Sequence, residues 1–189
     1  KQHNGDNAAK MVVEKVIEEK RGGDIYQLSV LLRDVAHPTL VVKVNYFAYE
    51  DCDIIKMNTE YINEGKKPIV LQKYMSAVLP IQSDNCVLMQ LEGNTKNENN
   101  EVVMPLPVGQ YNISTTTASR VAQYFNASFM LGLDGKLEEQ NCPVIAGTLV
   151  WMGNTHFEFY NTAVSRVPTL FMGGINPAAS DYTLAGGKS

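Results

Sequence analysis

The chain of 189 residues has no apolar run that approaches the roughly 18 to 20 residues of a membrane-spanning helix. It also lacks an excess of positive charge, with 16 Lys and Arg against 20 Asp and Glu and a net charge of -4, which argues against nucleic acid as a partner. Its content of 44% hydrophobic residues excludes disorder of the whole chain, because disordered chains are poor in aliphatic residues. The length and the apolar content predict one folded domain, or at most two small ones.

Cysteine is scarce. The chain has only Cys52, Cys86 and Cys142, so at most one disulfide can form and at least one thiol is left over. Their wide spacing provides no CxxC pair for a metal or for redox chemistry. We therefore expect them to act mainly as small apolar side chains, and the sequence leaves their pairing open.

The common enzyme signatures are absent as well: the sequence contains no HExxH zinc motif, no GxSxG nucleophile elbow and no GxGxxG phosphate-binding turn. Glu50, Asp51 and Asp53 suggest a calcium loop, because calcium prefers several oxygen ligands from one segment. Two isoleucines follow, however, where a further oxygen ligand or a glycine bend is needed, and this favours a solvated loop. We therefore predict no metal and no cofactor.

The first residues, 1–7, are polar, and no methionine precedes them. Such a segment is typical of a tether that follows a removed signal peptide or lipid anchor, and equally of a polypeptide trimmed at a loop. We predict a tether over 1–7, a single β-rich domain over 8–177 that begins with a helix over 8–21, and a flexible tail over 178–189. A subdivision of the domain near residue 84 stays open.

The helix prediction rests on the spacing in Ala8–Lys20. Its apolar residues, chiefly Met11, Val12 and Val16, recur on one narrow face, and a pair of glycines ends the run. Because the face is narrow, we expect this helix to dock on a larger element.

After the glycine pair the apolar period changes from 3.6 to 2, which is typical of strands. Residues 26–32 and 40–47 alternate in this way, and His37-Pro38-Thr39 joins them, so we predict a strand pair. Further runs with this alternation lie at residues 87–92, 128–133, 148–152, 155–161 and 169–172. Asp134-Gly135 and Gly153-Asn154 are hairpin-turn signals. We predict a mainly β fold: an antiparallel β-sandwich or barrel-like domain with one N-terminal α-helix.

Three segments are harder to assign. Residues 93–101 are rich in Asn and poor in apolar side chains, which predicts a solvent-exposed loop. Residues 53–73 fit either strands or an irregular excursion, and residues 119–125 fit a short helix.

Pro105 and Pro107 remove two amide donors from their segment and hold it extended. Gly109 follows, and glycine tolerates a positive φ. We therefore expect a sharp turn at Gly109, where a substitution by valine should destabilise the fold.

Candidate site residues lie on one predicted strand, where His156, Glu158 and Tyr160 alternate along a single face. A histidine, a carboxylate and a phenol on an exposed face can bind a ligand or transfer protons. The pattern favours the alternative, an amphipathic strand with these three residues in solvent and with Phe157 and Phe159 in the core. No serine or cysteine can be assigned as a partner from spacing, so no nucleophilic triad is predicted.

Trp151, the only tryptophan, lies beside the predicted turn at Gly153-Asn154. Together with the tyrosines it offers flat rings on which sugars stack, while amides and carboxylates bind the hydroxyl groups. Its parity with Leu149 argues instead for a place in the core. The ligand-binding candidates are accordingly His156, Glu158, Tyr160 and Trp151, and no catalytic residue is assigned.

One resemblance covers about residues 86–174. A Leu-Pro-x-Gly-x-Tyr strand at 106–111 is followed by an Asp-Gly turn at 134–135 and by Ile-Ala-Gly-Thr-Leu-Val at 145–150. This order resembles the β-sandwich domains of Bacteroides cell-envelope lipoproteins, whose function is mostly unassigned. The resemblance implies an extracytoplasmic, lipid-tethered location, and it brings no catalytic residues.

We therefore expect a non-enzymatic extracytoplasmic protein with a binding or scaffolding role, lipid-anchored at the outer membrane or cell surface, or in the periplasm. Its expected partners are glycans or a surface protein, without nucleic acid, and with membrane contact only through the anchor. The alternative is a hydrolase of unrecognised type that acts on carbohydrate or peptide, with His156 and Glu158 as acid and base. A third interpretation, a secreted eukaryotic or viral surface domain, predicts glycosylation at the sequons of Asn112 and Asn126.

Overall fold

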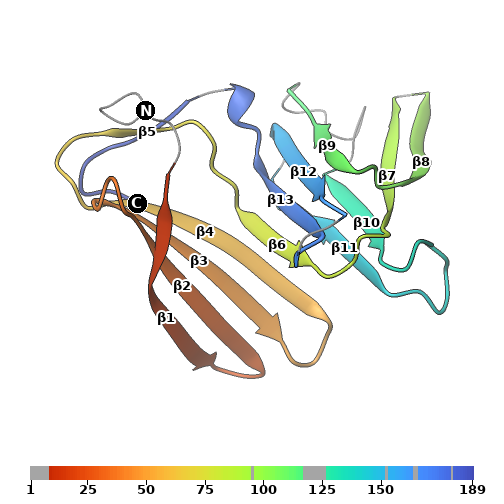
Figure 1. Cartoon of the computed structure of the whole chain (residues 1–189), viewed down its shortest axis with the longest axis horizontal. Coiled ribbons are helices and arrows are strands. Elements are labelled where there is room, and N and C mark those ends of the chain that lie inside the picture. The colour runs from red at the N-terminus through yellow and green to blue at the C-terminus, as the bar shows by residue number, and fades with distance from the viewer. Residues whose placement is uncertain (1–8, 95, 117–126, 152, 164–165, 180) are drawn as a thin grey trace. The chain divides into compact units, whose positions relative to one another are not determined.

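Figure 1 shows the computed structural model, which describes residues 9–94, 96–116, 127–151, 153–163, 166–179 and 181–189. These residues form a mainly β fold of antiparallel sheets, as the sequence predicts. The chain divides into two compact units: unit 1 contains residues 1–77 and 180–189, and unit 2 contains residues 78–179. In the order of the sequence, unit 2 is therefore inserted between the two segments of unit 1.

Unit 1 contains a four-stranded antiparallel sheet with the order β1-β2-β3-β4. The strands are β1 (Met11–Arg21), β2 (Ile25–Asp34), β3 (Leu40–Tyr49) and β4 (Ile54–Asn63). The strand pair predicted over 26–32 and 40–47 is confirmed as β2 and β3, with Val30 opposite Val44. Leu28 and Tyr46 share one face of β2 and β3, and the polar residues Gln27, Ser29 and Asn45 share the other, where each is at most 6% exposed.

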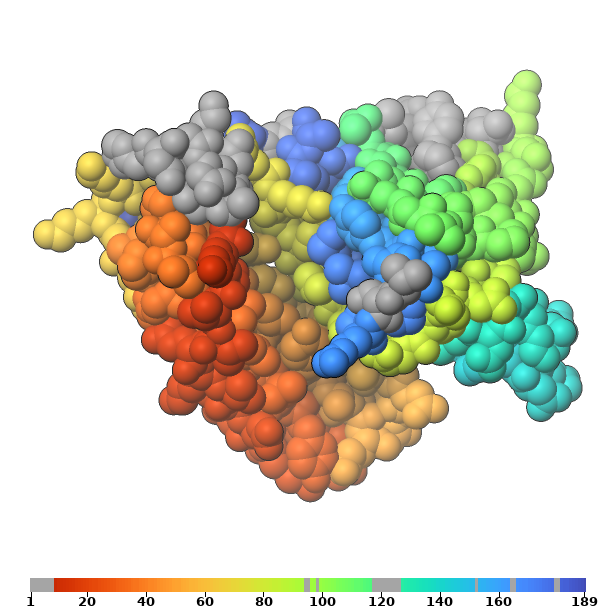
Figure 2. Space-filling model, viewed as in Figure 1, coloured from red at the N-terminus to blue at the C-terminus, as the bar shows by residue number. Residues whose placement is uncertain are grey.

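β1 corrects the helix predicted over 8–21, because it pairs with β2 along its length. A β-bulge between Val13 and Lys15 shifts the alternation of side chains, and this shift imitates the helical spacing of the apolar residues. β1 is an edge strand that is exposed along most of its length (Figure 2), so the Glu and Lys residues that favour a helix in isolation are tolerated there.

A two-stranded ribbon completes unit 1. β5 (Ile69–Leu71) pairs with β14 (Tyr182–Leu184), so the segment predicted as a tail contains a strand. Leu40, Leu71 and Leu184 form a buried apolar cluster between the sheet and the ribbon. The ribbon therefore covers the end of the sheet at which β3 begins.

Asn63, at the end of β4, is fully buried and ties the sheet to the ribbon. Its Nδ2 donates to the carbonyl oxygens of Lys67 at 2.8 Å and of Leu184 at 3.1 Å. Its Oδ1 accepts a hydrogen bond from the Gly65 amide at 3.0 Å. One side chain thus fixes the turn after β4 and the last strand of the chain.

Unit 2 contains two four-stranded antiparallel sheets, with the orders β11-β10-β7-β8 and β6-β13-β12-β9. The first sheet consists of β7 (Val87–Asn94), β8 (Asn97–Pro105), β10 (Ser128–Gly132) and β11 (Val144–Thr148). The second consists of β6 (Ala77–Ile81), β9 (Gly109–Ser114), β12 (Thr155–Asn161) and β13 (Thr169–Ile175), and a short 3-10 helix η1 (Pro177–Ala179) follows. The strand predicted over 148–152 lies earlier than expected, at β11.

Four phenylalanine rings join the facing sheets of unit 2. Phe129 of β10 packs against Phe157 and Phe159 of β12, with ring centroids 5.6 and 5.1 Å apart, and against Phe171 of β13 at 4.6 Å. None of the four residues is more than 7% exposed. The predicted core positions of Phe157 and Phe159 are therefore confirmed.

Two glycines provide the space for these rings. A Cβ atom at Gly147 would lie 2.5 Å from Cε1 of Phe129, and one at Gly173 would lie 2.6 Å from Cζ of Phe171. Since such distances are shorter than any ordinary van der Waals contact, the rings pack directly on the backbone at both positions.

The remaining expectations have mixed outcomes. The segment 93–101 is predicted as a loop, but its described residues contribute to the hairpin of β7 and β8, where Asn94 pairs with Asn97. Gly109 has a φ of +107°, as the sequence predicts. The helix predicted over 119–125 lies outside the described residues. In the described part of the chain, no helix is long and apolar enough to cross a membrane.

Candidate functional site

The predicted site residues of β12 surround a buried carboxylate. Glu158 is only 4% exposed, and its Oε1 accepts hydrogen bonds from Gln110 Nε2 at 2.6 Å and from the Tyr160 hydroxyl at 3.0 Å. His156 Nε2 lies 3.8 Å from the same oxygen. The structure thus brings His156, Glu158 and Tyr160 together and adds Gln110 from β9, which sequence analysis missed because the pairing of β9 with β12 cannot be read from either strand alone.

This cluster is more closed than the sequence pattern predicts. The strand face was expected in solvent, but the side chains of Glu158 and His156 are mostly buried. A buried carboxylate is tolerated when hydrogen-bond donors surround it, and Gln110 and Tyr160 supply them. The geometry supports a polar network that links β9 to β12, and a role of these residues in ligand binding stays a prediction.

Trp151 lies in the connection between β11 and β12 and is 47% exposed, so the core position predicted from its parity with Leu149 is wrong. Its indole packs on the backbone of Gly153, where a Cβ atom would lie 2.5 Å from Nε1. The preceding Val150 is almost fully exposed. Trp151 therefore presents a half-exposed aromatic ring next to an exposed aliphatic side chain.

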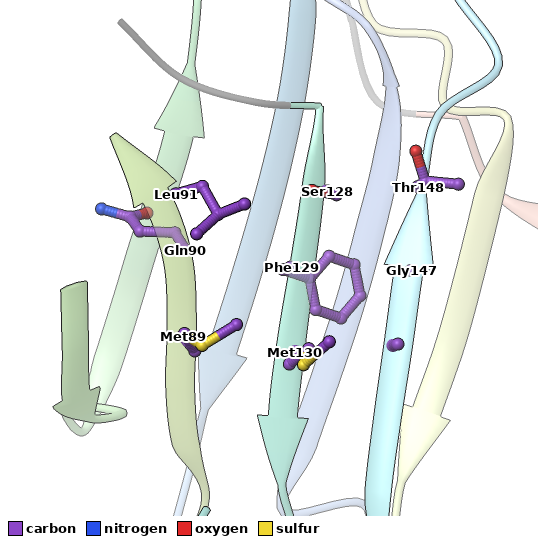
Figure 3. A pocket seen from close by; sticks show the side chains of 9 residues that line it. Met89, Gln90, Leu91, Ser128, Phe129, Met130, Gly147 and Thr148 are labelled. Carbon is purple, nitrogen blue, oxygen red and sulfur yellow. The ribbon is translucent and has the colours of Figure 1, made fainter. Parts of the chain in front are cut away.

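A small cavity of about 230 Å³ opens in the first sheet of unit 2 (Figure 3). The pairing of β10 with β7 extends from Gly132 opposite Val87 only as far as Met130 opposite Met89, and the cavity opens beyond this last pair. Its walls are mostly apolar, and none of the described residues that line it has a titratable side chain.

A larger cavity, of about 670 Å³, lies within unit 1 and is called here the His37 cavity. The volume falls in the range of roughly 300–1,000 Å³ that is typical of small-molecule sites. Its apolar lining includes Met11, Leu40, Tyr61, Ile69 and Leu71, and its polar lining includes Asp34, His37, Thr39, Lys66, Lys67, Gln72 and Lys73. The sequence pattern of residues 37–39 predicts only a connection between strands, because nothing in it shows that the segment 65–73 faces these residues.

The cysteines and the acidic residues considered for a metal site do not come together in the described part of the chain. Cys52, Cys86 and Cys142 are separate free thiols, of which only Cys86 is buried. Glu50 and Asp53 flank the turn between β3 and β4. Among the described residues, no group of three or more His, Cys, Asp or Glu side chains is arranged to hold a metal ion.

Comparison with protein-family models gives a match over residues 1–185 to the glycosyl hydrolase family 36 N-terminal domain. The chain belongs to this family. Membership in glycosyl hydrolase family 36 corrects the resemblance to Bacteroides envelope lipoproteins, which rested on a short and degenerate pattern of turn and strand residues. It also overturns the expectation of a non-enzymatic envelope protein with a binding or scaffolding role. No similar sequence is found among the curated proteins.

Solved structures agree with the family 36 assignment at the level of the fold. The α-galactosidase of Lactobacillus brevis superposes with a TM-score of 0.84 at 21% identity, over 99% of this chain and 26% of that chain. The α-galactosidase AgaA of Geobacillus stearothermophilus gives a TM-score of 0.84 at 19% identity, over 98% of this chain and 27% of that chain. AgaB of the same organism gives 0.86 at 18% identity, with the same coverage. This family 36 chain therefore spans about a quarter of the length of these solved structures.

Proposed function

We propose that this family 36 N-terminal domain is part of an enzyme that hydrolyses α-galactosides. The observation that carries the proposal is the family match over residues 1–185, and the fold shared with α-galactosidases supports it. Of the interpretations that the sequence leaves open, the carbohydrate hydrolase is therefore the one retained. We also infer that the facing sheets of unit 2 form a β-sandwich, joined by the rings around Phe129.

In this proposal the domain does not perform the hydrolysis alone. Most glycoside hydrolases use two carboxyl groups that flank the scissile bond at a separation of roughly 5–9.5 Å. In the part of the chain that the structure describes, the His37 cavity is lined by a single carboxylate, Asp34, and the smaller cavity by none. We infer that the reacting carboxylates lie outside these 189 residues.

The proposed substrates are galactose-containing oligosaccharides, because structures of AgaA variants contain stachyose and raffinose. Of the partners predicted from the sequence, the glycan is therefore kept. Trp151 is our candidate for a direct sugar contact, since its exposed ring is held against Gly153 and aromatic rings pack on the apolar faces of sugars. The protein partner and the extracytoplasmic location stay predictions, and the lipid anchor, which rested on the lipoprotein resemblance, is not retained.

Hydrolysis of p-nitrophenyl α-galactopyranoside tests the proposal, with the corresponding α-glucoside as the control substrate. The longest natural polypeptide that contains these residues should release p-nitrophenol from the galactoside and little from the glucoside. The 189-residue chain alone should release none. Release by the chain alone would show that the carboxylates lie within it, and no release by the longer polypeptide would refute the proposed function.

A further inference from the structure

The walls of the His37 cavity are fixed by hydrogen bonds that do not involve a ligand. Arg33 donates to the carbonyl of Pro38 and, at 2.8 Å, to the Glu64 carboxylate. The Glu64 amide donates to the Thr39 carbonyl at 2.8 Å, and Asn63 holds the turn that follows. A site that is already ordered requires little loss of conformational entropy on binding.

The floor of the cavity is apolar. Leu40 and Leu71 belong to the buried cluster of unit 1, and Tyr61 packs against it. The Tyr61 hydroxyl donates to the Met75 carbonyl at 3.1 Å, so that the phenol is held in place. A flat, fixed ring beside aliphatic side chains suits the C–H face of a sugar.

The lining also contains a buried carboxylate, that of Asp34, and a buried imidazole nitrogen of His37 without a hydrogen-bond partner in the described part of the chain. Asp34 is 1% exposed, and its Oδ1 accepts hydrogen bonds from the amides of Ala36 at 3.0 Å and Lys10 at 3.3 Å. Its Oδ2 lies 3.8 Å from His37 Nδ1. This imidazole nitrogen is buried and has no hydrogen-bond partner among the described residues. Because buried polar atoms nearly always have a partner, the lining has room for a ligand group here.

The chemistry of the lining distinguishes between classes of ligand. A wholly apolar ligand would leave the Nδ1 atom of His37 without a hydrogen bond. A polyanion would attract the three lysines of the lining but would be repelled by the buried carboxylate of Asp34. A saccharide suits both the polar and the apolar part of the lining. Its hydroxyl groups donate and accept hydrogen bonds, and its C–H faces cover apolar surface. Gln72, Lys66 and Lys67 add further groups that bind hydroxyls.

We propose that the His37 cavity is a non-catalytic saccharide-binding site, which holds an oligosaccharide of the enzyme's own substrate class without cleaving it. The substrate class rests on the proposed function, whereas the site itself rests on the geometry of unit 1. The single carboxylate in the lining is the reason that we assign binding and not hydrolysis to it.

The test is an NMR titration of the isotope-labelled 189-residue chain with raffinose, which follows the imidazole signals of His37 and His156. Raffinose should shift the His37 signal in a saturable manner and leave the His156 signal in place, because His156 does not line the cavity. Maltotriose and inorganic phosphate serve as competing probes, the first for a site that accepts any sugar and the second for an anion site.

Three variants localise the binding. Lys67→Ala and Gln72→Ala each remove one polar group from the rim without touching the apolar cluster, and each should weaken raffinose binding roughly three- to tenfold, the effect of one lost hydrogen bond. Lys15→Ala is the matched control, because Lys15 is an exposed lysine of β1 that does not line the cavity. Its affinity should equal that of the unchanged chain.

The absence of a saturable His37 shift with either sugar overturns the proposal, and so does saturation by phosphate alone, which would identify an anion site. Equal weakening by Lys15→Ala and Lys67→Ala would also contradict it. Binding and hydrolysis are measured separately, so a chain that binds raffinose while the longer polypeptide cleaves no galactoside refutes the proposed function only. If the chain does not bind raffinose while the longer polypeptide cleaves the galactoside, only the proposed binding site is refuted.

Discussion

Replacement of Gly147 by alanine should destabilise unit 2, because the new methyl group meets the Phe129 ring. The added Cβ would lie 2.5 Å from Cε1 and 2.6 Å from Cζ of that ring. The ring cannot easily move away, since three further phenylalanine rings surround it. Overpacking of this kind typically costs about 1–3 kcal/mol of unfolding free energy.

A double-mutant cycle with Phe129 isolates the cause. Phe129→Ala should itself cost about 3–5 kcal/mol, the usual effect of truncating a buried phenylalanine. In this background the methyl group of Gly147→Ala finds space, so its cost should disappear and leave a coupling free energy of about 1 kcal/mol or more. Phe129→Leu provides a milder background if the alanine variant does not fold.

Urea denaturation followed by tryptophan fluorescence measures these effects in unit 2, because Trp151 is the only tryptophan and lies in that unit. The unchanged chain is the reference. Additivity of the two substitutions within roughly 0.5 kcal/mol would refute the reasoning. So would a Gly147→Ala variant as stable as the unchanged chain.

Three further predictions concern single residues. Gly109→Val should lower the free energy of unfolding by about 1–3 kcal/mol, because the φ of +107° disfavours a β-branched residue. Each kcal/mol should lower Tm by about 2–4 °C, whereas Gly22→Val should leave Tm unchanged. An unchanged Tm for Gly109→Val would contradict this prediction. Asn63→Ala should destabilise unit 1 by about 1–3 kcal/mol, because it removes the side-chain donor to the Leu184 carbonyl in a buried hydrogen bond and the donor to the Lys67 carbonyl in a partly buried one. Unaltered amide hydrogen exchange in β5 and β14 would contradict this prediction. Burial raises the pKa of the Tyr61 phenol, so the unfolded chain loses this proton first and the stability of unit 1 should fall as the pH rises above about 10. Tyr61→Phe should make that fall shallower in urea titrations, and identical slopes for both chains would exclude this role of Tyr61.

The strands of the interior could be predicted from the sequence, and the edge of the sheet could not. β2, β3 and β12 have a clear alternation of apolar and polar residues, and the structure confirms them. β1 is rich in Glu and Lys, and only its pairing with β2 makes it a strand. Local propensity favours a helix there, and the long ladder of backbone hydrogen bonds outweighs it.

The sites were harder to predict than the strands, for a related reason. The sequence places His156, Glu158 and Tyr160 on one face, which is correct, but the burial of Glu158 depends on Gln110 of a strand that lies about 50 residues earlier. The His37 cavity depends in the same way on contacts between distant segments. Residues 37–39 and 65–73 carry no motif, and they become a cavity only when Asn63 and the ribbon bring them together.

The ribbon also sets an order of events during synthesis. The hydrogen bond from Asn63 to the carbonyl of Leu184 joins residues 121 positions apart, and all of unit 2 lies between them. A chain that grows from its N-terminus therefore exposes β1–β4 first but must release the whole of unit 2 before β14 can pair with β5. Contacts of such long sequence separation form slowly, so Leu40 and the apolar residues around it remain exposed to solvent while unit 2 folds. Within these 189 residues, the sheet whose strands are synthesised first is therefore covered only after unit 2 has been synthesised.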